Sequence, residues 1–409
     1  MTDKMIWLWL SLHFGAGKKI YKKLYNHFES VNDIFECDDD DVALIPGIMD
    51  AERDKLLDKN TKEAELIYKW CERFDVKILT PSDDEYPQPL RLLEDFPAVL
   101  YCIGNLPDFQ NKLCISVVGT RNMSITGMNN AYELGYGLTK GGAFVISGMA
   151  KGIDTTAQKG AMFAGGSTIA VLGCGINYIY PAENDEVYKK ILAVGAAITE
   201  YPPNTPPNAS NFPVRNRLIS GLSSAVVVVE AGTTSGALIT ARRAQEQDKK
   251  IFAYPGDVND FRSDGSNQLI KDGAQAITSA IDVLEQFMDT YKDTIDLSAS
   301  KLKPNKKDRS SVSNKRYEFK EDFLYERRKS KRKDGRILEP INKPQRVIFD
   351  SSVLNDDEKL VYDFMKPGIP LNVNGFKDLN MDSGTLVSCL GTLELLGVVT
   401  VVNGYYTRK

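Results

Sequence analysis

The sequence predicts a doubly wound α/β sheet in the middle of the chain, with a small all-α domain before it and a winged-helix domain after it. From residue 114 onward, short β-rich runs alternate with helical stretches, which is the pattern of a mostly parallel sheet. The run 225–229 is apolar throughout, as in a strand that is covered on both faces. The length of 409 residues corresponds to two or three domains.

Residues 1–75 are predicted to form the helical N-terminal domain, of helix-hairpin-helix or SAM-like type. A lysine-bearing helix follows an apolar one, with Gly15 and Gly17 in the turn between them, and a weaker copy of the pattern turns at Gly47. The amides of such a turn can face a phosphate. The alternative is a helical bundle with ordinary turns. We favour the bundle, because the acidic residues 38–41 would repel DNA.

The composition excludes several classes of protein. The 42% apolar and 26% charged residues are typical of a globular chain. Six widely spaced cysteines argue against a zinc ribbon or a disulfide scaffold, and two histidines argue against a His-rich metal site or a Ser-His-Asp triad. The apolar stretch 5–12 is too short to span a bilayer, and its spacing continues as one helical face. We expect a cytoplasmic protein with no membrane contact, cofactor or metal.

The sheet domain is predicted over residues 76–289 and is followed by a basic, disordered linker over 290–350. Within 301–350, 17 Lys and Arg against 8 Asp and Glu give a net charge of +9, which leaves −13 of the total of −4 for the rest of the chain. Residues 351–409 indicate two helices and an Asn-Gly hairpin, the pattern of a winged helix. The second helix, 383–396, has no Lys or Arg, so we interpret this domain as a protein-contact module.

The first two strand ends of the sheet carry glycines, hydroxyls and cations. Ligands of such sheets bind beyond the carboxyl ends of the strands. There, glycines let backbone N–H groups approach an anion, a helix N-terminus adds its dipole, and a cation adds a partner. Two such loops in succession predict a phosphate site, formed by Gly119, Thr120, Arg121, Ser147, Gly148 and Lys151.

The third strand ends in a GxG sequence, but Tyr178 stands where a dinucleotide-binding fold has a third glycine, and the chain has no P-loop sequence. A helix start then carries Phe212, Arg215, Asn216 and Arg217. The arginines suit phosphates, and the ring can stack on a base, which contributes about 1–3 kcal/mol. The alternative is that Phe212 packs into the core and one arginine forms a structural salt bridge.

Further cations and hydroxyls follow the later strands, at 232–236, at Arg242 and Arg243, and at Lys271. One nucleotide needs only one or two such loops. A set spread over this many strand ends suits an extended polyphosphate backbone.

Several segments resemble the successive signatures of the DNA-processing protein A family, also called DprA or Smf. They appear in that family's order over about 115–275 and include VVGTRN (117–122), SGMAKGID (147–154), NFPVRNR (211–217), VVEAGTTSG (228–236) and GSNQLIKDGA (265–274). The flanking domains also look like those of this family.

The resemblance implies an extended Rossmann-like domain that binds single-stranded DNA. It also implies a homodimer that protects incoming strands in natural transformation and loads the RecA recombinase onto them, without enzymatic activity. The DNA-binding residues carried over are Gly119, Thr120, Arg121, Ser147, Gly148, Lys151, Phe212, Arg215, Asn216 and Arg217, with Lys271 in the matching late helix. Two positions depart from the family: Lys151 stands where arginine is common, and Gln158 where histidine is common.

Two other hypotheses remain open. The sheet is also similar to the lysine-decarboxylase-like phosphoribohydrolases, which process nucleotides, but the comparable loop at 230–236 has no glutamate where the helix opens. Alternatively, the terminal domains make the functional contacts and the sheet domain is a dimer scaffold. Apolar residues on the late helices, such as Leu284 and Phe287, are candidates for the dimer surface.

Overall fold

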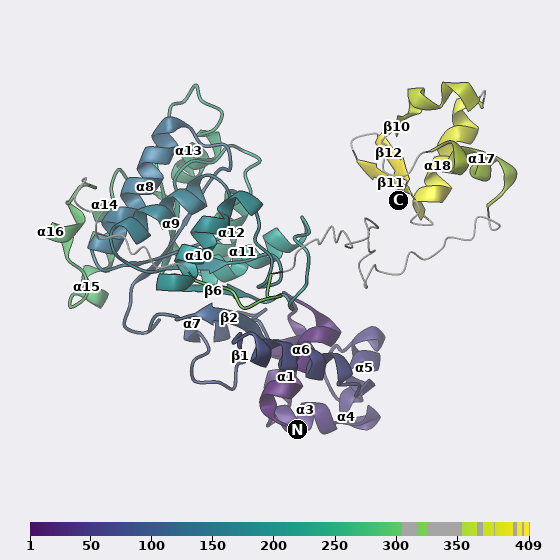
Figure 1. Ribbon diagram of the computed structural model, residues 1–409, viewed down its shortest axis with the longest axis horizontal. Coiled ribbons are helices and arrows are strands. Elements are labelled where there is room, and N and C mark those ends of the chain that lie inside the picture. The colour runs from purple at the N-terminus through teal and green to yellow at the C-terminus, as the bar shows by residue number, and fades with distance from the viewer. Residues whose placement is uncertain are drawn as a thin grey trace. The chain divides into compact units, whose positions relative to one another are not determined.

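The computed structural model describes residues 1–304, 317–324, 354–365, 371–379, 381–395, 399–402 and 405–408 (Figure 1). The chain divides into two compact units, Met1–Tyr325 and Glu326–Lys409. The first unit contains the N-terminal helices and the large sheet, and the second contains a small helical unit with three short strands.

The N-terminal helices are α1 (Asp3–Phe14), α2 (Ile20–His27), α3 (Val31–Glu36), α4 (Asp39–Ala43), α5 (Asp50–Leu57) and α6 (Lys62–Arg73). The strands of the large sheet are β1 (Lys77–Leu79), β2 (Leu100–Gly104), β3 (Cys114–Val118), β4 (Phe144–Ser147), β5 (Thr168–Val171), β6 (Ala196–Thr199), β7 (Ala225–Val228), β8 (Lys250–Ala253) and β9 (Gln275–Ala276). The helices between and after these strands are α7 (Gln88–Arg91), α8 (Ile125–Lys140), α9 (Ile153–Phe163), η1 (Ala182–Asn184), α10 (Asp185–Val194), α11 (Asn211–Gly221), α12 (Ala237–Glu246), α13 (Asp264–Lys271), α14 (Ala280–Leu284), η2 (Glu285–Phe287), α15 (Met288–Tyr291) and α16 (Leu297–Ser300).

The large sheet has the strand order β1-β2-β6-β5-β4-β3-β7-β8-β9. Neighbouring strands from β6 to β9 are parallel, whereas β2 is antiparallel to both β1 and β6. The chain moves outward from β3 through β4, β5 and β6, and then returns to the other side of β3 with β7 and β8. The predicted mostly parallel α/β sheet is therefore confirmed, and its direction of winding reverses between β3 and β7. Ligands bind in the crevice at such a switch point.

The continuous apolar runs of the strands supply two cores, one on each face of the sheet. Val226 and Val228 of β7 join one hydrophobic cluster, and Ala225 and Val227 join the other. Successive side chains of a strand point to opposite faces, so a strand covered on both sides must be apolar at every position. This packing explains why β7 shows no polar alternation in the sequence.

Helices α8 and α9 cross closely because glycines stand at the contact. A Cβ added at Gly135 would lie 2.1 Å from the carbonyl oxygen of Ala157, and one added at Gly160 would lie 2.2 Å from that of Tyr132. Neither distance is possible for a real side chain, so both positions require glycine. The crossing determines how α8, which follows β3, and α9, which follows β4, are placed against each other.

The N-terminal helices share a hydrophobic core with the sheet and lie next to β1 and β2, as the purple ribbons of Figure 1 show. Trp7 and Trp9 of α1 are fully buried. The ring of Trp7 meets that of Phe96, which comes from the loop before β2, edge to face at 6.0 Å. Aromatic packing of this kind joins these helices to the sheet.

The predicted disordered linker is corrected in two places. Ser300 of α16 is buried, and the backbone N–H of Asp296 donates to Gly141 at the end of α8. Residues 317–324 also pack on the first unit, with Phe323 only 2% exposed. The prediction of disorder rested on the net charge, the frequent Pro, Ser and Asn and the lost apolar periodicity, but the aromatic residues within 317–324 supply enough apolar surface for burial. Residues 305–316 and 325–350 lie outside the described residues.

The second unit contains α17 (Asp356–Phe364), β10 (Leu371–Asn372), η5 (Val373–Leu379), α18 (Ser383–Leu395), β11 (Val399–Val402) and β12 (Tyr405–Arg408). Strand β12 pairs antiparallel with β10 and β11. Val361, Leu390 and Leu393 are buried in its core. Two helices followed by an antiparallel pair match the predicted order of elements, and the winged-helix assignment stays a prediction. The Asn-Gly turn predicted before β12 lies outside the described residues.

Burial also determines the state of the cysteines and of two residues that were candidates for a dimer surface. All six cysteines are buried, and desolvation raises the thiol pKa to about 12 in Cys71, Cys102, Cys114 and Cys174. Leu284 and Phe287 lie in the core with at most 9% exposure, so the expectation that they form a dimer surface is wrong. In the described part of the chain, no helix has both the length and the apolar character that a membrane crossing requires.

Candidate nucleic-acid interface

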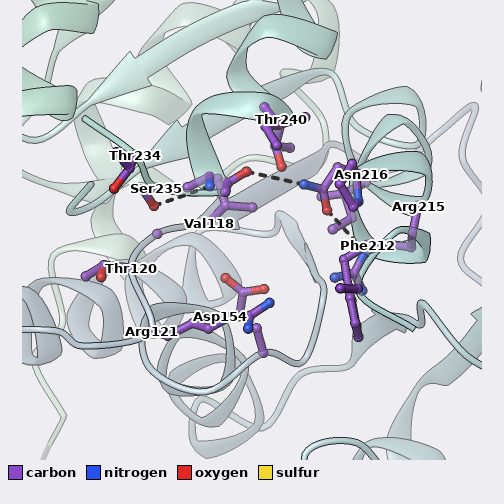
Figure 2. Close-up of a pocket in the computed structure, with 18 of the residues that line it drawn as sticks. Val118, Thr120, Arg121, Asp154, Phe212, Arg215, Asn216, Thr234, Ser235 and Thr240 are labelled. Atoms are coloured by element: carbon purple, nitrogen blue, oxygen red, sulfur yellow. Dashed lines mark hydrogen bonds between the residues drawn. The ribbon is translucent and has the colours of Figure 1, made fainter. Parts of the chain in front are cut away.

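A cavity of about 500 Å³ opens at the switch point between β3 and β7 (Figure 2). Its walls are the loops after β3, β4, β5 and β7, the segment before α11, one face of α11 and the start of α12. This is the edge of the sheet at which the sequence predicted binding. Most of the lining is polar or small, with hydroxyls on one side and an aromatic ring on the other.

The loop after β3 brings Arg121 to the cavity. A Cβ added at Gly119 would lie 2.6 Å from Cγ1 of Ile153, so only glycine fits there. The backbone N–H of Thr120 donates to the carbonyl of Glu230 at 2.7 Å, and its carbonyl accepts from Ile153 at 3.2 Å. The loop is thus held on both sides, and Arg121 projects from it with an exposed side chain that lines the cavity.

Helix α11 places the ring of Phe212 close to two guanidinium groups. Arg121 and Arg215 both lie with Cζ 5.7 Å from the centre of the Phe212 ring, which is cation–π range. Tyr180 adds a second ring at 5.3 Å. Behind Phe212, a Cβ added at Gly173 would lie 2.7 Å from the ring, so this glycine leaves the space that the ring occupies. Phe212 therefore lines the cavity as a half-buried aromatic surface.

Arg215 and Asp154, a guanidinium and a carboxyl group, are both buried in the lining of the cavity. Arg215 is 4% exposed, and its Nη1 donates to the carbonyls of Gly148, at 3.0 Å, and Val171. Burial lowers the pKa of this guanidinium, and the nearby carboxyl of Asp154 opposes that shift. Burial likewise raises the pKa of Asp154, against the opposing effect of Arg215. Asp154 also accepts a hydrogen bond from the N–H of Gly148 at 3.1 Å.

Gly148 and Asn216 hold Arg215 in place, but only Asn216 lines the cavity. A Cβ added at Gly148 would lie 2.7 Å from Nη2 of Arg215, so the guanidinium occupies the space that a side chain would take. Asn216 accepts from Nε of Arg215 at 3.2 Å and donates to the carbonyl of Gly236 at 3.3 Å. Asn216 therefore connects α11 to the start of α12.

The structure does not bring all the predicted residues to the cavity. Ser147 is fully buried, and its hydroxyl donates to the carbonyl of Val117 at 2.6 Å. Lys151 is exposed beside the lining, with its Nζ 4.0 Å from Glu183. Lys271 ends α13 as an exposed residue that does not line the cavity. Arg217 is 1% exposed and forms a salt bridge with Glu200. Its environment is therefore that of the alternative hypothesis, in which one of the two arginines is structural.

Several lining residues were missed from the sequence. Thr234, Ser235 and Gly236 line the cavity at the start of α12. These residues follow the most apolar strand, and their hydroxyls and glycine are typical of an anion-binding helix start. The predicted set of DNA-binding residues nevertheless did not include them. Asp154 and Tyr180 are two further lining residues that the predicted site did not include. No local pattern marks Tyr180, because only the fold brings the loop after β5 to α11.

Glu230 follows β7 at the place where a phosphoribohydrolase-like site was considered. Its carboxylate accepts from the backbone N–H of Ser124 at 3.0 Å and also from the Ser124 hydroxyl. A Cβ added at Gly127 would lie 2.2 Å from this carboxylate. Glu230 is 5% exposed and binds the start of α8, where an acidic group complements the helix dipole. This carboxylate therefore has a structural role at α8.

A model of the family described as DNA recombination-mediator protein A matches residues 77–288, just over half of the 409-residue chain. The chain belongs to the DNA recombination-mediator protein A family. The resemblance found in the sequence is thereby confirmed. All residues that line the cavity lie within the matched segment. The cavity therefore lies in the segment of the chain that the family model describes.

Individual relatives agree with this assignment. DNA processing protein DprA of Streptococcus pneumoniae is 41% identical over 205 residues, which cover 50% of this chain and 72% of the relative. Protein Smf of Synechocystis sp. is 33% identical over 282 residues, which cover 68% of this chain and 71% of the relative. The X-ray structure of DprA from Streptococcus pneumoniae is similar with a TM-score of 0.61 at 33% identity, over 70% of this chain and 98% of that one.

Proposed function

We propose that this protein binds single-stranded DNA in the cavity between β3 and β7. The observation that carries the proposal is that the ring of Phe212 lines the cavity within cation–π range of both Arg121 and Arg215. A ring of this kind can stack on an unpaired base, and a neighbouring exposed arginine can neutralise the adjoining phosphate. The names of the relatives, DNA processing proteins, support a nucleic-acid ligand.

The shape of the cavity favours a single strand over a duplex. Phe212 is half-buried in a concave site, whereas the bases of a duplex are stacked within the helix. A strand has to offer an unstacked base to reach the ring. The hydroxyls and backbone amides near Thr234 and Ser235 can donate to phosphates of any sequence. Binding should therefore depend little on base sequence.

We further propose that the bound strand is protected and handed to RecA during natural transformation, by a cytoplasmic homodimer that has no enzymatic activity of its own. Membership of the DNA recombination-mediator protein A family supports this part of the proposal. The nucleotide-processing alternative has no comparable support, because the carboxylate of Glu230 is bound to the start of α8.

Fluorescence anisotropy with labelled oligo-dT tests the binding. Arg121→Ala should weaken binding about tenfold and reduce the slope of log affinity against log salt by about 0.7, the single-strand value for one phosphate contact. Lys112→Ala is the matched control, because it removes an exposed cation just before β3, at the opposite end of that strand. A duplex of the same length should compete poorly. Unchanged affinity in a folded Arg121→Ala/Phe212→Leu variant would exclude this cavity as the binding site.

RecA loading needs a separate test. Oligo-dT is covered with a single-stranded DNA-binding protein, and RecA filament growth is followed with and without this protein. The wild type should shorten the lag, and Arg121→Ala should do so less. An equal lag with and without the wild type would contradict the loading proposal while leaving the DNA-binding proposal intact.

A further inference from the structure

We propose that Arg217 is a positioning residue, which joins helix α11 to the N-terminal helices through Glu200, so that the docking of these helices sets the geometry of the DNA cavity. The functional consequence rests on the DNA binding proposed above. The contacts themselves do not depend on it.

Helix α11 presents two opposite faces. Phe212, Arg215 and Asn216 lie around the cavity in Figure 2. Val214 and Arg217, three residues apart and therefore on a common face, contact the N-terminal turn instead. A rotation or shift of this one helix would therefore move the aromatic ring and Arg215 together.

Arg217 forms a buried ion cluster on the second face. Its Nη2 lies 2.8 and 2.7 Å from the two carboxylate oxygens of Glu200, and its Nε lies 3.3 Å from Oδ2 of Asp95. The side chains of Arg217 and Glu200 are 1% and 3% exposed. Burial raises the pKa of Glu200, and the charge of Arg217 is the largest effect that opposes the shift. Arg217 thus opposes the neutralisation of Glu200 that burial favours.

The same carboxylate binds the N-terminal domain. The backbone N–H of Gly17 donates to Oε1 of Glu200 at 3.1 Å. Gly17 has φ +70°, and a Cβ added there would lie 2.6 Å from Cγ1 of Val214. The Gly15–Gly17 turn, which could have presented its amides to a phosphate, therefore lies against α11 with the Gly17 amide bound to Glu200. This contact supports the interpretation of an ordinary structural turn.

The cluster offers a way to separate positioning from DNA contact. Removing one member of a buried ion pair leaves an uncompensated charge, whereas removing both charges is often neutral. Arg217→Met leaves Glu200 unpaired. Arg217→Met/Glu200→Gln removes the two most buried charges and keeps a side-chain oxygen for the amide of Gly17. It leaves Asp95, whose side chain is 19% exposed and so reaches solvent.

The experiment compares these two variants with the wild type in oligo-dT anisotropy and in hydrogen exchange of the α11 amides, residues 211–221 except Pro213. Arg217→Met should weaken DNA binding at least tenfold and speed exchange in α11. The double variant should restore both to within about threefold of the wild type, because no phosphate contact has been lost. Affinity that stays as low in the double variant as in Arg217→Met would overturn the proposal and assign Arg217 a direct DNA contact.

A second pair of variants tests the link from the N-terminal side. Gly17→Ala should weaken DNA binding and speed α11 exchange although no cavity residue is changed. Gly47→Ala is the matched control, because Gly47 also has a positive φ, +64°, but nothing within 4 Å of an added Cβ. Equal effects of the two substitutions on α11 exchange would overturn the proposal. Hydrogen exchange reports on the link without DNA, so absence of DNA binding by the wild type would contradict only the proposed function.

Discussion

At the scale of the residue, Arg121, Arg215 and Arg217 show how burial gives one residue type three roles. Arg121 is exposed and can meet a phosphate. Arg215 is buried beneath the cavity and binds main-chain carbonyls, so it shapes the surface beside Phe212. Arg217 lies on the opposite side of α11 and pairs with a carboxylate. A buried guanidinium needs partners at fixed positions, which makes it a structural element as much as a charge.

Gly148 should be sensitive to the smallest side chain. In Gly148→Ala, the new methyl group meets the Arg215 guanidinium, which is itself hydrogen-bonded to the carbonyl of Gly148. We expect a loss of about 1–3 kcal/mol in the free energy of unfolding, together with weaker oligo-dT binding. Urea denaturation and anisotropy measure the two effects. Gly236→Ala, at a cavity residue with open space around an added Cβ, should leave the free energy of unfolding unchanged.

Asp154 should make stability depend on pH. Burial raises its pKa in the folded protein, so its favourable contribution is complete below the unfolded pKa of about 3.9 and is lost as pH rises through the folded value. Asp154→Asn cannot ionise. Its free energy of unfolding relative to wild type should therefore increase between pH 4 and pH 8 in urea titrations. The exposed Asp54→Asn serves as control, and a pH-independent difference for Asp154→Asn would contradict this assignment.

At the scale of the element, the sequence was sufficient for the strands and their ends but not for the facing of α11. Apolar runs and glycines predicted the strands and the loop that carries Arg121. Residues two apart on a helix lie on nearly opposite faces, so Arg215 and Arg217 could not both line one cavity. Which of them does so depends on how α11 packs on the sheet, and this is decided by distant partners such as Glu200. Tyr180 was unpredictable for the same reason.

The crossing of α8 and α9 should tolerate no side chain at its centre. Gly135→Ala places a methyl group 2.1 Å from the carbonyl of Ala157, which forces the helices apart. We expect a loss of at least about 1–3 kcal/mol in the free energy of unfolding. Asn129→Ala, at an exposed position of α8, should change stability little. Equal midpoints of urea unfolding for the two variants would show that the crossing can relax.

At the scale of the whole molecule, the most basic segment of the chain contains aromatic residues that pack on the first unit. Residues 301–350 carry +9 against −13 elsewhere. The aromatic residues of 317–324 nevertheless pack on the first unit. Phe323 lies with its ring centre 5.7 Å from those of Trp70 and Phe74, and Phe319 stacks on Tyr188 at 5.9 Å. The basic stretch is therefore attached to the body at an internal point as well as at its start.

This attachment should protect one trypsin site. Lys320 donates to the carbonyl of Arg73 at 2.9 Å and pairs with Asp75, so its peptide bond is held in the packed segment. Phe319→Ser/Phe323→Ser should release it and speed cleavage after Lys320 severalfold, as followed by mass spectrometry at low trypsin. Cleavage after Lys112, an exposed residue before β3, is the internal control. Equal rates after Lys320 in both proteins would rule out stable docking.

The burial of the cysteines has a chemical consequence. Only a thiolate reacts readily with oxidants and alkylating reagents, and thiols with a pKa near 12 are almost entirely protonated at neutral pH. With all six cysteines buried, the folded protein should resist disulfide exchange and maleimides. A single Lys112→Cys substitution would then carry one fluorophore at a defined surface position, so strand capture could be followed in real time on a chain that keeps its native thiols.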